Sequence, residues 1–400
     1  MTLKPAGRID LRPLRPASIW PNPSQLCLLK AALWSGEEAR MAWAEWQRIT
    51  ELGAVDFSSW NLLPLVWRNL SNQGMTDDPL LAECQGYYRY HWAKNQVLLN
   101  HAAGWVATWQ AKGVPVVVLK GIPLLIDCYR DAGLRPMADV DLLVPMDRVQ
   151  EVAALLRADG WTKHIHREEW NSVTLEAQQS YNWQKNGAHL DLHWHVDERC
   201  TEPGVTDWQW SMVQPLQIKG VTTRQLCPEH LLVHVCSHGM IWNPGQAPFR
   251  WLADADYILR RYGATFDWSR VLEASERMNV RLVLRHGLTY AAAELRLPVP
   301  AAVLAELNGR KYGWSERHAY HSTTHPSQGG RLGRGLKVGR LLGRVAGEGS
   351  LVERWQRVSR FMCTRWGARN LPEALWLVVR KLITGDRDNW LDRDGGQSGP

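Results

Sequence analysis

The sequence predicts an α+β fold in which a small mixed-sheet module is flanked by N-terminal and C-terminal helical regions. Two observations carry this prediction. Apolar residues recur at helical spacing between residues 24 and 111 and again between 227 and 296, whereas the segments from 114 to about 200 alternate between strand-like and helical patterns. The 400 residues are enough for two or three modules, each with a core of its own.

The N-terminal part combines a short irregular segment with a helical region. Residues 1–22 are rich in Pro and Arg and are expected to be extended or disordered, and 23–112 form the helical region. Leu26, Leu29 and Leu33 recur there at helical spacing. The chain holds 23 Trp, which we interpret mainly as core residues where helices pack, with an aromatic-lined groove for sugars or bases as the alternative.

The mixed-sheet module is predicted to span residues 113–220. The apolar run from Val114 to Leu119 indicates a buried strand that ends at a glycine turn, and Pro145 precedes a helical pattern. We expect strands at 114–120 and 138–144, helices at 121–131 and 147–159, and further strands near 161–166, 172–182 and 188–196.

Two carboxylates, Asp139 and Asp141, lie two residues apart in an otherwise apolar segment. Alternate residues of a strand point to the same face, so both carboxylates would share one face while Val140 and Leu142 face the core. Each carboxylate raises the cost of ionising the other. Mg²⁺, which takes one or two carboxylates and completes its shell with water and substrate phosphate, would relieve this repulsion.

A third carboxylate, Asp191, lies in a segment that again alternates like a strand. Asp191, His193 and His195 share one face of this strand. If the strand neighbours the first one, three carboxylates converge, which is enough to hold two metal ions. Two-metal sites stabilise the attacking and the leaving oxygen of an in-line displacement at phosphorus.

A glycine follows the first predicted strand. Gly121 precedes a helical segment, where its lack of a side chain lets backbone amides approach a phosphate at the helix N-terminus. Pro123 suits the first turn of that helix, because its missing amide costs little there. The segment therefore predicts phosphate binding beside the carboxylates.

This order of strand, glycine turn, helix, Asp-x-Asp strand and later single-Asp strand resembles the nucleotidyltransferase superfamily of the DNA-polymerase-β type. More closely, the chain resembles the bacterial family of uncharacterised nucleotidyltransferases, over roughly residues 20–300. The matching motifs are Leu63-Pro64-Leu65-Val66-Trp67, Leu119-Lys120-Gly121, Tyr129, Arg135-Pro136-Met137-Ala138-Asp139-Val140-Asp141-Leu142-Leu143-Val144, Asp191-Leu192-His193-Trp194, His230-Leu231-Leu232-Val233-His234 with His238, and Arg250-Trp251-Leu252-Ala253-Asp254.

The resemblance implies a Mg²⁺-dependent enzyme that transfers a nucleoside monophosphate from a nucleoside triphosphate to an acceptor and releases pyrophosphate. Asp139 and Asp141 would bind two ions, either Mg²⁺ or alternatively Mn²⁺. Asp191 would complete the ion on the acceptor side or take the proton of the acceptor.

On the nucleotide side, the resemblance singles out Lys120, Gly121 and Arg135. Most members of the superfamily carry Gly-Gly or Gly-Ser where this chain has Lys120-Gly121. The lysine would either add a positive charge against the triphosphate or point away and leave the phosphates to the backbone. Arg135 would pair with the triphosphate or with the carboxylates, and a structural ion pair is the alternative.

Four histidines and one carboxylate are the candidates on the acceptor side. His193 and His195 would contact the nucleotide or the acceptor, with a place in the core as the alternative. His234 and His238 are one helical turn apart and would shape the acceptor pocket, with a zinc site as the alternative. Asp254, at the edge of an apolar helical stripe, is expected to cap or pair with one of these histidines or with Arg135.

The favoured acceptor is a small molecule or a glycan precursor, by analogy with the genes that neighbour members of the family. An RNA- or protein-modifying transferase and a catalytically silent scaffold of the same fold are the alternatives. The last hundred residues carry 17 Lys and Arg against 9 Asp and Glu. Residues 331–381 are therefore candidates for contact with an anionic polymer or a membrane surface, with a solvated linker as the alternative.

Beyond the module we expect a helical region at 221–305, a basic and partly helical region at 306–385, and a disordered tail at 386–400. The seven cysteines include no CxxC pair, so the sequence indicates neither a zinc site nor a disulfide framework. It also has no apolar run of the length that a membrane span or a signal peptide needs. These features favour a cytoplasmic protein.

Overall fold

The computed structural model covers most of the chain between residues 19 and 384. The irregular segment expected at 1–22 lies outside the described residues except for its last four, and the tail expected at 386–400 lies wholly outside them. Most of the basic run 331–344 also lies outside. The described residues are 19–50, 55–163, 175, 178–197, 200, 204–241, 249–314, 316–317, 320–321, 338–339, 342–343, 345–346, 349–366 and 368–384.

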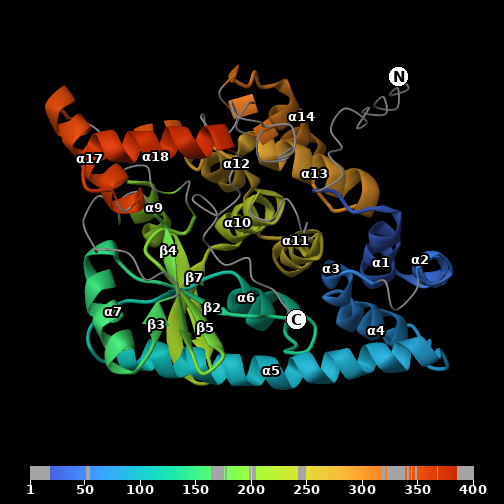
Figure 1. Cartoon of the computed structure of the whole chain (residues 1–400). Helices are drawn as coiled ribbons and strands as arrows, with labels where there is room; N and C mark the ends of the chain where they lie inside the picture. Colours follow the sequence, from blue (N-terminus) through green and yellow to red (C-terminus); the bar gives the residue numbers. More distant parts are fainter. Residues whose placement is uncertain are drawn as a thin grey trace.

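A seven-stranded mixed sheet lies in one half of the molecule, at the lower left of Figure 1. Its order is β3-β4-β5-β2-β1-β7-β6, with β2–β5 and β1–β7 parallel and the other neighbours antiparallel. The α+β prediction is therefore confirmed. The strands are β1 (Val117–Val118), β2 (Val140–Leu143), β3 (Thr162–Lys163), β4 (Ser180–Lys185), β5 (Ala188–His193), β6 (Val213–Ile218) and β7 (Val221–Leu226).

Strands β2 and β5 occupy the middle of the sheet because their apolar residues are buried. Val140 and Leu142 of β2, and Leu190 and Leu192 of β5, are at most 1% exposed. They share a core with the C-terminal half of helix α5 (Pro79–Gln110) and with α7 (Val149–Ala158). Each such side chain contributes about 1.5–3 kcal/mol when it leaves water, so this core holds the two strands in place.

The expected strands differ from the observed ones mainly at their ends. The strand at 114–120 pairs only at Val117–Val118, because Lys120 turns away with φ 49°. The strand at 188–196 ends at His193. Of the strand near 172–182, only Leu175 and 178–182 are described, and β4 begins at Ser180; of that near 161–166, residues 164–166 lie outside the described part.

The β6–β7 hairpin was not predicted. Pro215 interrupts the pattern of β6, which lies at the edge of the sheet, where a missing amide is tolerated. The turn between the strands is Lys219-Gly220, and both residues have positive φ, as in the common two-residue hairpin turn. The boundary expected between 220 and 221 falls in this turn.

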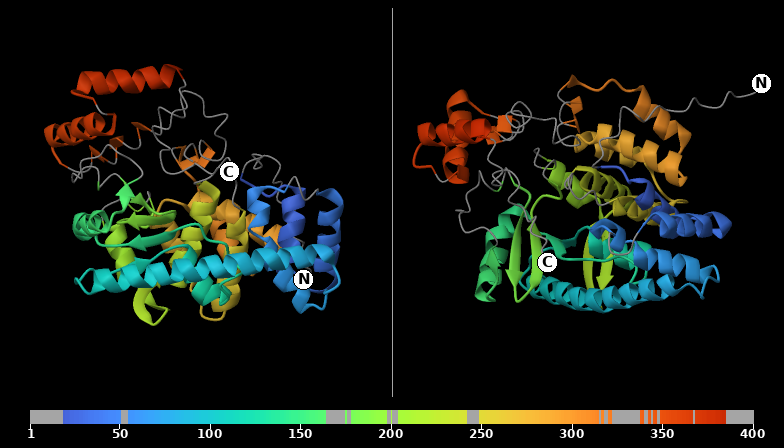
Figure 2. Two further views of the ribbon diagram at one scale, coloured as in Figure 1. Left: turned by 60° about the horizontal axis from the view of Figure 1, so that its bottom comes forward. Right: turned by 45° about the vertical axis from the view of Figure 1, so that its right-hand side comes forward.

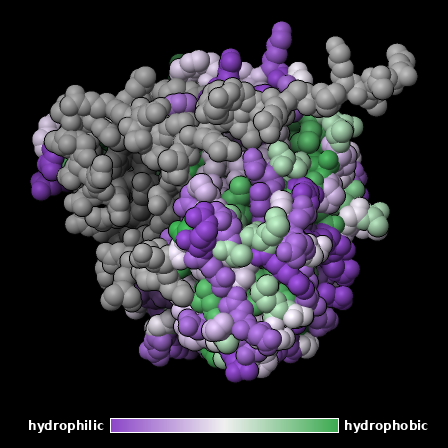
Figure 3. Space-filling model, turned by 90° about the vertical axis from the view of Figure 1, so that its right-hand side faces the viewer, coloured by the Kyte–Doolittle hydropathy of each residue, from purple (hydrophilic) through white to green (hydrophobic). Residues whose placement is uncertain are grey.

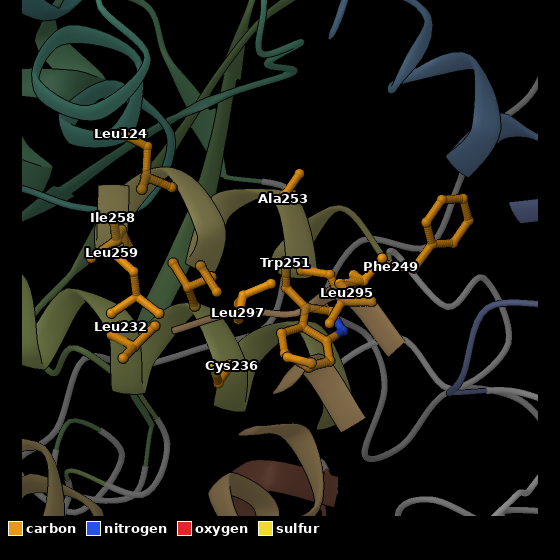
Figure 4. Close-up of a cluster of buried hydrophobic side chains, with 14 of the residues drawn as sticks. Leu124, Leu232, Cys236, Phe249, Trp251, Ala253, Ile258, Leu259, Leu295 and Leu297 are labelled. Carbon is orange, nitrogen blue, oxygen red and sulfur yellow. The ribbon is translucent and has the colours of Figure 1, made fainter. Parts of the chain in front are cut away.

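The helices before and after the sheet share one core. Buried residues of α1, α2 and α4 join those of α10, α11 and α13 in a single cluster, part of which Figure 4 shows. Helix α5, which Asp78 caps at its N-terminus, reaches from this cluster to the sheet core and spans the molecule (Figure 2). The helices are α1 (Pro23–Leu33), α2 (Gly36–Ile49), α3 (Phe57–Trp60), α4 (Leu63–Asn72), α9 (Val205–Ser211), α10 (Pro228–Ile241), α11 (Arg250–Tyr262), α12 (Trp268–Arg277), α13 (Arg281–Leu295) and α14 (Ala301–Gly309).

Two further helices, α17 (Leu351–Trp366) and α18 (Leu371–Thr384), pack on each other near the C-terminus.

The side of the molecule that carries α1 to α4 is a mosaic of hydrophilic residues and small hydrophobic areas (Figure 3). Tryptophans divide between core and surface: Trp43 and Trp46 stack in the interior, whereas Trp92 is 47% exposed. Among the described residues, no helix is long and apolar enough to cross a membrane.

Candidate active site

The register of the sheet brings two of the three predicted carboxylates together. Strands β2 and β5 run parallel as neighbours, and Asp141 lies directly opposite Asp191. Both residues are buried, with exposures of 4% and 8%. Asp139 lies one residue before β2 and two residues before Asp141, and the charges of Asp141 and Asp191 act on it. The predicted adjacency of the two strands is confirmed.

Two cationic side chains sit against this pair of carboxylates. The Nζ atom of Lys120 lies 2.5 Å from Oδ1 of Asp141 and 3.6 Å from Oδ2 of Asp191. The Nε2 atom of His193 lies 3.1 Å and 2.9 Å from the same two oxygens. His193 is on β5, two residues after Asp191, and it is fully buried.

The charges in this cluster hold one another in their ionised forms. Burial opposes ionisation of Asp141 and Asp191, but the charges of Lys120 and His193 outweigh it and hold the pKa of both carboxyls below the usual range. Burial likewise opposes protonation of His193, and the Asp191 carboxylate outweighs it and raises the pKa of the ring to about 9. Loss of solvent and repulsion from Asp141 raise the pKa of Asp139 to about 6.

The turn that follows β1 has a strained backbone at Lys120 and little free space at Gly121. Lys120, not Gly121, has the positive φ of 49°, so the side chain that contacts Asp141 stands on a backbone conformation that such residues rarely adopt. Gly121 is the first residue of α6 (Gly121–Pro123). A Cβ atom there would lie 2.7 Å from Sδ of Met137 and 3.0 Å from Nη1 of Arg135, so the two side chains leave no room for a larger residue at this position. A π-helical segment, η3 (Leu124–Tyr129), continues from α6.

The structure places Arg135 in a buried ion pair behind the turn. Its Nε and Nη2 atoms donate to the two carboxylate oxygens of Asp254, at 2.8 Å and 3.0 Å, and the Tyr129 hydroxyl donates to the same carboxylate at 2.8 Å. The pairing that the sequence suggested for Asp254 is thus observed. Arg135 and Asp254 are each at most 6% exposed.

The predicted histidines separate into two groups. His234 and His238 lie on α10 with ring centroids 5.9 Å apart, and the charges of Lys120 and His193 act on both rings. Burial is the largest cause that lowers the pKa of His234 to about 4, and neither ring nitrogen has a hydrogen-bond partner within the described residues. His195 instead forms a hydrogen bond through Nδ1 with the hydroxyl of Thr206, at 2.6 Å.

Arg250 joins the site although the sequence assigned it no role. Its Nη1 donates to the carbonyl of Pro136 at 2.9 Å, and its buried Nε has no partner among the residues that the structure describes. Burial, followed by repulsion from Arg135, lowers its pKa to about 10, and its charge acts on Asp139. The signal that could have found it is its place four residues before Asp254 in the motif that carries the resemblance.

A family model described as an uncharacterised nucleotidyltransferase matches residues 44–296. The chain belongs to this nucleotidyltransferase family, and the protein is a transferase. Two solved structures align with about half of it: the antibiotic-resistance factor ANT(2'')-Ia, at 18% identity over 51% of this chain and 97% of that one with a TM-score of 0.30, and an antigenic nucleotidyltransferase-like protein from Paracoccidioides brasiliensis, at 12% identity over 52% and 96% with a TM-score of 0.34. No curated protein matches the chain.

In this nucleotidyltransferase the residues around the carboxylates fit a divalent ion. Asp141, Asp191 and His193 each offer one ligand atom, and these atoms all lie within 4.8 Å of one another. The Oδ1 atom of Asp191 is buried and has no hydrogen-bond partner in the described part of the chain. A buried carboxylate oxygen without a partner is costly, and an ion would satisfy it.

Proposed function

We propose that the protein transfers a nucleoside monophosphate from a nucleoside triphosphate to an acceptor, with Mg²⁺ as the ion and pyrophosphate as the second product. The observation that carries this proposal is the register of β2 and β5, which sets Asp141 against Asp191 beside Asp139. Three carboxylates at one end of two strands form the kind of site that holds metal ions against a phosphate chain.

In this proposal Asp139 and Asp141 hold the ions, and Asp191 completes the set. The low pKa of Asp191 supports a role as ligand over a role as the base that takes the acceptor's proton. A bound divalent ion, Mg²⁺ or alternatively Mn²⁺, would offset the negative charge of the triphosphate. An acceptor oxygen forms the new bond to the α-phosphorus, and the bond from that phosphorus to the β-phosphate oxygen breaks.

The triphosphate would lie along the turn between β1 and α6. Lys120 and the amides around Gly121 provide one side, as the resemblance implies. Arg250 provides a further positive charge that has no carboxylate partner among the described residues, beside Asp139. Arg135 packs against Gly121 of this turn, and its ion pair with Asp254 holds it in place.

For the acceptor we propose a small molecule or a glycan precursor, recognised in the cytoplasm. His234 and His238 support this choice, because loss of solvent lowers the pKa of both rings and keeps them neutral beside the charges of Lys120 and His193. The seven cysteines, all of them free thiols, support a reducing compartment.

The test is the thermal stability of the full-length protein with each of the four nucleoside triphosphates, with and without Mg²⁺. We expect at least one nucleotide to raise the melting temperature only when Mg²⁺ is present. Asp139→Asn should weaken this shift. The matched control is Asp147→Asn, an exposed aspartate beyond the other end of β2, which should keep it. No shift with any nucleotide would contradict the proposal and favour a silent scaffold.

A further inference from the structure

Helices α17 and α18 form a small unit with a core of its own. Ala374 and Val378 of α18 pack in one cluster with Met362 of α17, and none of these side chains belongs to the two large cores of the chain. Both views of Figure 2 place the pair at the periphery of the molecule. The residues of the candidate active site all lie at or before Asp254, so the proposed function leaves this pair without a role.

A second side of α18, away from this core, is apolar and exposed. Leu375, Trp376 and Val379 are 45%, 57% and 50% exposed. At 100° per residue, their positions fall within an arc of about 100° around the helix, so they form one face. A surface helix normally buries one apolar stripe and turns polar residues to water. An apolar face on each of two sides indicates that α18 has a second apolar partner.

Uncompensated positive charge accompanies this face. Residues 331–384 contain twelve Lys and Arg against three Glu. Two of the glutamates, Glu353 and Glu373, each accept a hydrogen bond from a backbone N–H in the preceding turn, at 2.8 Å. Arg354 and Arg360 of α17 are exposed, and neither forms an ion pair within the described residues. The second partner of the pair is therefore expected to carry negative charge as well as an apolar surface.

The exposed tryptophan of this face has an arginine against its ring. The guanidinium carbon of Arg380 lies 5.3 Å from the centroid of the Trp376 ring. The amphipathic ring of a tryptophan suits the boundary between lipid chains and headgroups, and a long arginine side chain can reach the phosphates from there. This pair of residues therefore matches the chemistry of a lipid surface.

We propose that α18 docks on an anionic lipid surface, with Leu375, Trp376 and Val379 inserted at the headgroup boundary and the arginines of the pair against the lipid phosphates. The helix has 14 residues, which is too short to cross a bilayer, so it would lie in the plane of the surface. The inference goes beyond the proposed function, because it involves neither the nucleotide nor the ion.

Two other occupants fit this face less well. A second copy of the chain would bring two positively charged helix pairs against each other, and facing like charges oppose association. A nucleic acid would neutralise the arginines, but its phosphate backbone offers no apolar partner to Leu375 and Val379. An anionic lipid surface satisfies both the charges and the apolar side chains.

The experiment is flotation of the full-length protein with vesicles, without nucleotide or metal ion. One set of vesicles is phosphatidylcholine alone, and the other is phosphatidylcholine mixed with phosphatidylglycerol. We expect the protein to float with the mixed vesicles and far less with the neutral ones, and added salt to release it. The double variant Trp376→Ser/Val379→Ser should bind at least about tenfold more weakly, because binding scales with the apolar area inserted. Arg380→Gln should weaken binding about fivefold, the effect of one positive charge near the surface.

Trp92→Ser is the matched control. Trp92 is a similarly exposed tryptophan, at 47%, but it lies on α5 and outside the helix pair. This variant should float like the wild type. The nucleotide-dependent thermal shift of the double variant should also equal that of the wild type, so a failure of the lipid proposal leaves the proposed function standing.

Four outcomes would overturn the proposal. The first is no flotation with either set of vesicles, and the second is equal flotation with both. The third is wild-type flotation of the double variant, which would place the lipid contact outside α18. The fourth is a wild type that sedimentation shows to be dimeric without lipid beside a monomeric double variant, which would assign the face to a second copy of the chain.

Discussion

The buried ion pair behind the nucleotide turn gives the sharpest prediction about stability. Asp254→Ala removes the carboxylate that accepts two hydrogen bonds from Arg135 and one from Tyr129. The variant leaves the Arg135 guanidinium buried without a counter-ion, and Arg250 is a second positive charge close to it.

The expected cost follows from the loss of one partner of a buried pair. Removal of such a partner destabilises a protein by about 3–5 kcal/mol, because the remaining charge stays out of water without compensation. Arg135 is 6% exposed and Asp254 is 3% exposed, so solvent screens neither charge. We therefore expect the free energy of unfolding to fall by about 3–5 kcal/mol.

The assay is unfolding in urea, followed by circular dichroism. The double variant Arg135→Met/Asp254→Leu should be more stable than Asp254→Ala, because apolar side chains leave no buried charge unpaired. Glu45→Ala is the control: Glu45 pairs with Arg48 at the surface, at 2.7 Å, and we expect no measurable change. An Asp254→Ala protein as stable as the wild type, within about 1 kcal/mol, would refute this reasoning.

Three further predictions concern activity, packing and pH. Asp139→Ala and Asp141→Ala should each abolish pyrophosphate release while the circular dichroism spectrum stays that of the wild type; full activity of the double variant would rule out the mechanism. In Gly239→Ala the new Cβ would lie 2.5 Å from Trp251, and we expect a loss of about 1–3 kcal/mol in urea, where an unchanged midpoint would contradict the close packing of α10 on α11. Burial lowers the pKa of His286 to about 4, below its unfolded value of about 6.5, so its contribution of about 3 kcal/mol is complete above pH 6.5 and is lost as the pH falls toward 4. His286→Gln should flatten the acid limb of a plot of stability against pH.

The centre of the site could be predicted because it depends on simple periodicity. Asp141 and Asp191 each interrupt an alternating apolar pattern, and such a pattern fixes which face of a strand is buried. The expected strands at 138–144 and 188–196 were therefore close to β2 and β5, and their pairing brought the two carboxylates together. The alternation also put His193 on the same face as Asp191.

The rest of the site depends on interactions that local patterns do not encode. The sequence assigned backbone freedom to Gly121, but the positive φ belongs to Lys120, which its contact with Asp141 helps to hold. Whether Arg135 meets a phosphate or a carboxylate depends on Asp254, which lies on a helix more than a hundred residues later. The β6–β7 hairpin was missed because Pro215 masks an edge strand.

The pairing of β1 with β7 has a consequence for how the chain folds. The Thr223 hydroxyl bonds the carbonyl of Val116, 107 residues earlier, so this pairing closes a long loop. Parallel pairing over such a separation is slow. Until β7 pairs with β1, the edge of β1 that β7 will cover is open to other chains. During synthesis at roughly 5–20 residues per second, that edge waits roughly 5–20 s for β7. A fragment that ends at residue 220 would keep the edge open permanently, and aggregation of that fragment is the expected result.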